Sequence, residues 1–320
     1  MRGDARGMGT PSASHNGDAL AVIHNEPLER AVALLTRDPR VEDPTNRWFV
    51  HPVGRLLLPY FVANRISANS VSIGGLLLGA LAAAAFAQWA TEWLFVWVGL
   101  ILAIGWLVAD GLDGMIARAT GTAGPVGRLF DGLCDHGTFV AIYVLLATSL
   151  GTPKAWILAC SAGAAHALQS NLYEGERERF HRRRGSFFGM TPDPARSMVL
   201  KAYDRLSSTF DRYGDALNSV FAGASDRSVA DTYRQSAQRP LQLMSLLSAN
   251  VRIYAVFVAC LLKSPTLFWW FELGPLTGVL AVGVAWRNHI DASFIGAAQT
   301  RALRARAPFS KPQNRKLSEL

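Results

Sequence analysis

The apolar residues of this chain are gathered into blocks that are long enough to cross a lipid bilayer. Half of its 320 residues are apolar, and an α-helix needs about 20 consecutive apolar residues to span the hydrocarbon. We expect six spans, over residues 71–89, 93–117, 129–150, 154–174, 243–263 and 265–287. Because a span must satisfy its backbone hydrogen bonds internally, the predicted fold class is an all-α integral membrane protein with six transmembrane helices.

The positive charges lie on one side of this predicted membrane. Of the 32 Lys and Arg residues, 29 fall before residue 71, in the 118–128 loop, in residues 175–242 or from Arg287 onward. The positive-inside rule therefore places both termini and the 118–128 loop in the cytoplasm. The basic residues that give the chain its net charge of +8 then face membrane lipids and phosphorylated substrates. No helix-turn-helix or zinc pattern accompanies them, so we expect no nucleic-acid partner. We place the protein in a bacterial inner membrane.

The segments around the spans divide the chain into five parts. We expect a flexible cytoplasmic arm, then an interfacial segment with the first four spans, a cytoplasmic insert, the last two spans and a cytoplasmic tail, over residues 1–45, 46–174, 175–242, 243–287 and 288–320. The stretch from Trp48 to Val62 is too short to cross and contains two prolines, which favours a position in the interface. Gly74, Gly75 and Gly79 predict close packing of the first span on a neighbouring helix.

Two pairs of aspartates stand at the facing ends of the second and third spans. At 100° per residue, Asp110 and Asp113 share one helix face, and Asp131 and Asp135 lie one turn apart on another. The short loop between the spans makes them antiparallel neighbours, so the two faces can meet. Carboxylates beside hydrocarbon are costly unless they are paired or coordinate a metal, and hard divalent cations prefer oxygen ligands. We therefore predict one or two divalent ions between these helices.

Small and basic residues complete the pattern. Gly114, Ala117 and Gly127 leave room for a flat or phosphorylated ligand near the backbone, and Arg118 can engage a phosphate oxygen. Written out, the sequence D-x2-D-G-x2-A-R-x8-G-x3-D-x3-D closely resembles the motif of the CDP-alcohol phosphotransferase family, with every motif position present.

This resemblance implies a membrane transferase of phospholipid synthesis that uses Mg²⁺ or Mn²⁺, which we expect as two ions. The enzyme would move a substituted phosphate group from a CDP-linked donor, such as CDP-diacylglycerol, to an acceptor hydroxyl and release CMP. The resemblance implies that Asp110, Asp113 and Asp131 ligate metal and that Asp135 is the general base beside the metals; Asp135 is also a candidate metal ligand. The implied CDP-binding residues are Asp110, Asp113, Gly114, Ala117, Arg118 and Gly127.

The acceptor is left open by the sequence. Glycerol 3-phosphate, serine, inositol or its phosphate, a second phospholipid and a diacylglycerol are all candidates. Arg252 lies within the fifth span, where a guanidinium is costly unless it reaches a cavity or an anion. We predict that Arg252 binds the acceptor's phosphate or the donor's head group; the alternative is that it snorkels to the interface. Arg177, after the fourth span, is a second candidate for acceptor binding. The remaining expected partner is a second copy of the chain, in a homodimer.

Two other classes of protein place carboxylates in membrane helices. An intramembrane prenyltransferase holds a metal–diphosphate with aspartate-rich helices, but its usual pattern has an asparagine and an aspartate where Ala109 and Ala117 stand here. A transporter with a carboxylate relay often shows internal repeats, and none is visible in this sequence. Both stay as alternatives to the transferase.

Overall fold

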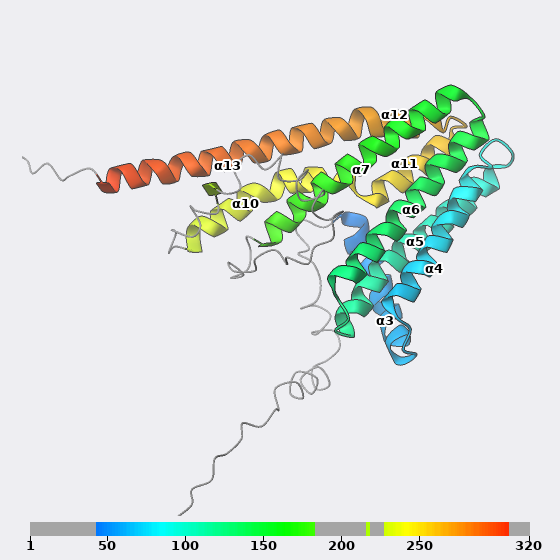
Figure 1. The fold of residues 1–320 in the computed structure, drawn as a ribbon, viewed down its shortest axis with the longest axis horizontal. Helices are drawn as coiled ribbons and strands as arrows, with labels where there is room; N and C mark the ends of the chain where they lie inside the picture. Colours follow the sequence, from blue (N-terminus) through cyan, green and yellow to red (C-terminus); the bar gives the residue numbers. More distant parts are fainter. Residues whose placement is uncertain (1–42, 183–215, 218–226, 307–320) are drawn as a thin grey trace, which may run out of the picture.

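The computed structural model describes residues 43–182, 216–217 and 227–306. Within these ranges the regular elements are helices, and no strand is present (Figure 1). The predicted arm up to residue 42, residues 183–215 and 218–226 of the predicted insert, and the predicted tail beyond Arg306 lie outside the described part of the chain.

The chain first forms a short helical segment with two unlike faces. A π-helix, η1 (Asn46–Val50), runs directly into α3 (His51–Ala63). Trp48 and Leu56 are exposed over most of their surface, whereas Val50 and Leu58 are buried against the protein. A segment that shows large apolar side chains on its outer face suits the interface of a membrane, as the sequence predicted.

Three long helices follow and pack side by side: α4 (Ala68–Phe86), α5 (Trp93–Ala119) and α6 (Pro125–Leu150) (Figure 1). Glycines bring α4 close to both partners. A Cβ atom at Gly75 would lie 3.2 Å from the side chain of Ala109 on α5, and one at Gly79 would overlap Thr138 on α6. The tight packing predicted for the first span is therefore confirmed at these two glycines, whereas Gly74 has no neighbour within 4 Å of such a Cβ.

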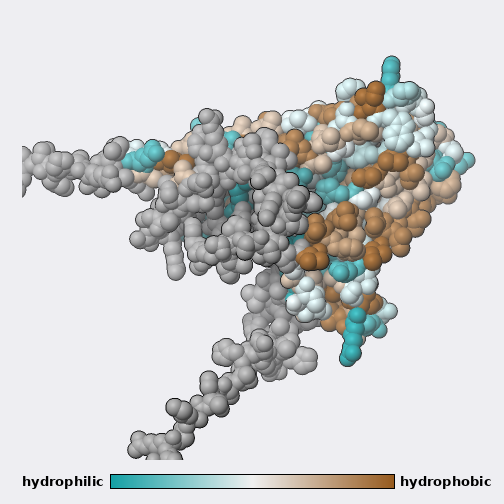
Figure 2. All heavy atoms as spheres, in the orientation of Figure 1, coloured by the Kyte–Doolittle hydropathy of each residue, from teal (hydrophilic) through white to brown (hydrophobic). Residues whose placement is uncertain are grey.

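The outer face of this bundle is apolar. Figure 2 shows hydrophobic residues gathered over the half of the molecule that contains α4, α5 and α6. On α4 the exposed residues Ile73, Leu77 and Leu81 recur every four positions and form one stripe. Apolar stripes that face away from the protein interior are expected where a helix borders lipid rather than water.

The second half of the chain contains α7 (Pro153–Arg182), α10 (Arg227–Met244), η2 (Ser245–Leu247), α11 (Ala249–Leu261), α12 (Thr266–Phe271), η3 (Glu272–Leu276) and α13 (Thr277–Arg306). The predicted fifth span is interrupted, because Ser248 is extended between η2 and α11. The predicted sixth span contains the π-helical η3 with Pro275, and its helix α13 continues past residue 287 to Arg306.

In the described part of the chain, five helical stretches are long and apolar enough to cross a membrane: Ala68–Phe86, Trp93–Ala119, Val126–Leu150, Asp231–Leu261 and Thr266–Thr300. The chain thus has the architecture of a multi-pass membrane protein. The predicted span over residues 154–174 lies in α7 and is not among the five, because His166 and Gln169 interrupt its apolar residues and are buried against other helices. The count of six spans therefore stays a prediction.

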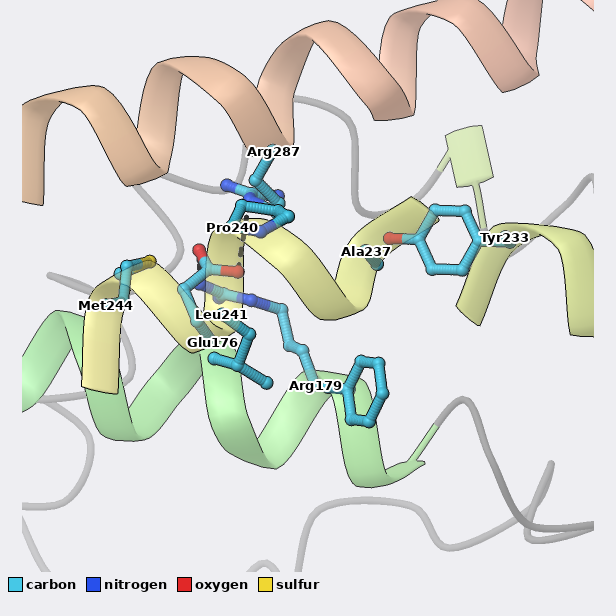
Figure 3. Close-up of a pocket in the computed structure, with 9 residues that line it drawn as sticks. Glu176, Arg179, Tyr233, Ala237, Pro240, Leu241, Met244 and Arg287 are labelled. Atoms are coloured by element: carbon cyan, nitrogen blue, oxygen red, sulfur yellow. Dashed lines mark hydrogen bonds and ion pairs between the residues drawn. The ribbon is translucent and has the colours of Figure 1, made fainter. Parts of the chain in front are cut away.

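The end of α7 packs with α10 and α13 in a second group of helices that extends from the bundle (Figure 1). Here Arg287 of α13 pairs with Glu176 of α7 at 3.0 Å and with Asp291 at 2.8 Å. Tyr233 of α10 donates a hydrogen bond to the other oxygen of Asp291 at 2.8 Å. All four side chains are buried, and Figure 3 shows Glu176, Arg287 and Tyr233 around one pocket. Part of the predicted cytoplasmic insert is thus a helix fixed to the rest of the chain.

Candidate active site

Three of the motif aspartates meet between α5 and α6. One carboxylate oxygen from each of Asp110, Asp113 and Asp131 lies within 4.8 Å of the other two. Asp113 is buried, and the other two are partly buried. The short connection between the end of α5 and the start of α6 turns the chain back on itself, so the carboxylates of the two helices face each other. The structure therefore brings these aspartates together as the helical spacing predicted.

The chemistry of this donor set fits Mg²⁺ or Mn²⁺. Carboxylate oxygens are the preferred ligands of hard divalent cations, and Mg²⁺ usually completes its shell with water and substrate phosphate. Three carboxylates at this separation would repel one another without a cation. Asp110, Asp113 and Asp131 are thus the residues that would hold a metal.

Asp135 lies one helical turn beyond Asp131 and lines the same small cavity as the other three aspartates. It stands outside the three-residue group whose oxygens converge. The remaining residues of this cavity are Ser72 and Gly75 of α4, Trp106 of α5 and Cys134 of α6. Asp135 therefore stands beside the group that would hold a metal, which is where a proton acceptor for a bound hydroxyl is needed.

The basic and small motif residues surround the polar end of this helix pair. The guanidinium of Arg118 lies over Gly114, and a Cβ atom there would be 3.2 Å from Nη1 of the arginine. Gly127, near the start of α6, has no neighbour within 4 Å of a Cβ position. Ala117 is partly exposed. Room for a ligand therefore exists at Gly127, whereas the absence of a side chain at Gly114 makes space for Arg118. Their roles in binding CDP stay predictions.

Two residues near the site were missed in the sequence. A Cβ atom at Gly111 would lie 2.8 Å from Val50, so this glycine lets η1 pack against α5 beside the aspartates. Ser72 of α4 donates a hydrogen bond from its hydroxyl to Oδ2 of Asp113. Gly111 lies inside the motif at a variable position, and Ser72 follows Asn69 and Ser70 in the polar start of α4. Neither feature of the sequence indicates which residue is contacted.

Arg252 is bound by other parts of the protein. Its Nε donates to Oε1 of Glu272 at 2.9 Å, its Nη2 donates to Oε1 of Gln169 at 2.8 Å, and its Nη1 donates to the carbonyl oxygen of Leu247. The side chain is 1% exposed, so it does not snorkel to the interface. A buried guanidinium needs a counter-ion, and here Glu272 supplies it. Binding of a phosphate by Arg252 stays a prediction that would require this pair to open.

Arg177 follows the predicted fourth span and lies in the second half of α7. Its Nη2 donates to Oε1 of Glu174 at 2.8 Å, and its guanidinium stands 5.8 Å from the ring of Tyr173. Burial lowers the pKa of Arg177, but Glu174, Tyr173 and the carboxylate of Asp110 outweigh this and leave the pKa above its usual value. Arg177 thus pairs within α7 itself, and its role in binding the acceptor stays a prediction.

Comparison with known proteins identifies the region that contains this site. The model of the CDP-alcohol phosphatidyltransferase family matches residues 65–178. The chain carries a CDP-alcohol phosphatidyltransferase domain. The resemblance seen in the sequence is thereby confirmed, and the matched region extends from the loop before α4 into the last turns of α7. It contains all eight motif residues, whereas α10, α11 and α13 lie outside it.

Cholinephosphotransferases are among the curated relatives of this domain. Cholinephosphotransferase 1 of Gallus gallus is 35% identical over 103 residues, which cover 30% of this chain and 31% of that protein. The protein of the same name from Xenopus laevis is 33% identical over 121 residues, or 35% of this chain and 28% of the relative. The human one is 34% identical over 101 residues, or 29% and 25%. The chain thus spans less than a third of the length of these relatives.

Proposed function

We propose that this protein transfers a substituted phosphate group from a CDP-linked donor to an acceptor hydroxyl in the membrane and releases CMP. One observation carries the proposal: the four motif aspartates line one cavity between α5 and α6, inside the region that matches the phosphatidyltransferase family. Phosphoryl transfer asks mainly for positioning and for neutralisation of charge, and this arrangement of acidic and basic groups can supply both.

The residues of the chain divide these tasks. A bound divalent cation would neutralise charge on the diphosphate of the donor. Arg118 binds a phosphate oxygen of the donor. Asp135 accepts the proton of the acceptor hydroxyl. A bond then forms between that oxygen and the phosphorus that carries the donor's alcohol, while the bond from this phosphorus to CMP breaks.

The relatives favour one class of donor. Their name describes transfer of a phosphocholine group, so we propose a CDP-linked small alcohol as the first donor to test, with a lipid hydroxyl as acceptor. CDP-diacylglycerol with a polar acceptor is the second. The basic segments support a cytoplasmic position for the aspartates and both termini; a bacterial inner membrane and a homodimer stay predictions from the sequence.

The test is an assay of purified protein in detergent with Mg²⁺. CDP-choline with diacylglycerol, and CDP-diacylglycerol with a panel of small acceptors, are incubated separately, and CMP and lipid products are measured by mass spectrometry. We expect CMP and a new lipid from one donor class, and loss of both with Asp131→Asn. Failure of both donor classes to release CMP would refute the proposal.

A further inference from the structure

Ser72 of α4 donates a hydrogen bond from its side chain to a motif aspartate. Its hydroxyl oxygen contacts Oδ2 of Asp113, 41 positions later in the chain. Ser72 is 6% exposed and Asp113 is 3% exposed, so water does not compete for this bond. The contact joins α4 to α5 at the wall of the cavity that all four aspartates line.

The hydroxyl of Ser72 has a second possible acceptor, which lies within α4 and outside the site. The carbonyl oxygen of Ala68 lies 3.2 Å from the same hydroxyl, and a serine within a helix commonly bonds to the carbonyl four residues earlier. A hydroxyl has a single proton to donate. A hydrogen bond to a charged acceptor is about twice as strong as one to a neutral acceptor, so the carboxylate of Asp113 is the preferred partner.

A fixed carboxylate matters for a metal site. A carboxylate can rotate about its last side-chain bond, and ligand residues are commonly held by hydrogen bonds from neighbouring groups. Ser72 uses one oxygen of Asp113 and thereby restrains that rotation. The packing of α4 on its neighbours does not depend on the hydroxyl, because Gly75 and Gly79 provide the close contacts with α5 and α6.

We propose that Ser72 is a positioning residue of the metal site: its hydroxyl holds the Asp113 carboxylate in the orientation in which it meets Asp110 and Asp131. The affinity of the site for a divalent cation then depends on this serine. The inference rests on the proposed function in one respect, namely that the aspartate group binds a metal.

The experiment measures Mn²⁺ binding to the purified full-length protein by calorimetry, without substrate. Loss of a hydrogen bond to a metal ligand typically weakens binding by about 10–100-fold, and we expect a loss in this range for Ser72→Ala. Ser72→Thr keeps a hydroxyl and is expected to stay within about threefold of the parent. Ser70→Ala is the matched control, because Ser70 lies two residues away on the same helix, is exposed and pairs with Ser67. It should bind Mn²⁺ as the parent does.

Each outcome shows whether Ser72 positions the metal ligand or only stabilises the fold. Thermal unfolding, followed by tryptophan fluorescence, should give similar midpoints for all four proteins. Unchanged Mn²⁺ affinity in Ser72→Ala would overturn the inference, and so would an equal loss in Ser72→Thr or a collapse of the fold in Ser72→Ala. A parent protein that binds no Mn²⁺ would instead refute the metal site of the proposed function, which separates the two failures.

Discussion

The buried pair of Arg252 and Glu272 gives a prediction about stability that also bears on substrate binding. Both side chains are at most 1% exposed, and Arg252 Nε lies 2.9 Å from Glu272 Oε1. Tyr143 donates a further hydrogen bond to the same oxygen at 3.1 Å. Removal of one partner from a buried ion pair leaves an uncompensated charge and costs about 3–5 kcal/mol. We expect this loss for Arg252→Met and a similar one for Glu272→Leu.

The double variant tests whether the two charges contribute to stability as a coupled pair. When both charges are removed, no buried charge is left alone, so Arg252→Met with Glu272→Leu should lose much less stability than the two single losses added together. The assay is unfolding in mixed micelles with increasing denaturing detergent, followed by the fluorescence of the tryptophans. Arg234→Gln is the control, because its pair with Asp231 is partly exposed and such pairs contribute about 0–1 kcal/mol.

Two results would refute this reasoning. Additive losses would show that Arg252 and Glu272 are not coupled. A stable Arg252→Met variant with a strongly raised KM for the acceptor would show that the guanidinium is available to substrate, and the binding role predicted from the sequence would then hold.

Three further predictions concern the site and the bundle. Asp135→Asn should lower kcat by at least about 100-fold with little change in donor binding, because it removes a proton acceptor and keeps an oxygen; near-normal kcat would show that Asp135 is not the base. Chelation with EDTA should abolish activity and Mg²⁺ should restore it, whereas full activity after chelation would exclude the metal site. Gly79→Val should destabilise the protein by about 1–3 kcal/mol through overpacking against Thr138; Gly74→Val, at a position without neighbours, should have little effect, and equal losses for both would contradict the packing described.

The helical period and one short loop were enough to predict the centre of the site. Asp110, Asp113 and Asp131 are brought together by the spacing within two helices and by the turn between them, and both can be read from the sequence. The close packing at Gly75 and Gly79 follows in the same way, because small residues in a membrane helix admit a neighbouring backbone. Local patterns of this kind predict structure well when the contacts they imply are between adjacent elements.

Contacts between distant segments could not be predicted in this way. The partner of Arg252 is Glu272, which lies in the π-helical η3. No pattern in the sequence predicts this π-helix. Ser72 meets Asp113 across 41 residues, although nothing in α4 itself distinguishes this serine. Most of α10 falls within the predicted insert of residues 175–242, yet this helix packs on α7 and α13 through Tyr233, Leu241 and Met244. In each case tertiary packing decided the outcome.

In the proposed reaction, the aspartate cavity directs an acceptor hydroxyl to the phosphorus that carries the donor's alcohol. The most direct measurement uses an acceptor whose hydroxyl oxygen is ¹⁸O, with the CDP-linked donor that supports activity, and follows the label by mass spectrometry. We expect equal amounts of CMP and lipid product, with ¹⁸O in the phosphodiester of the lipid and none in CMP, and loss of both products in Asp110→Asn. Label in CMP, or CMP formed without a lipid product, would contradict it.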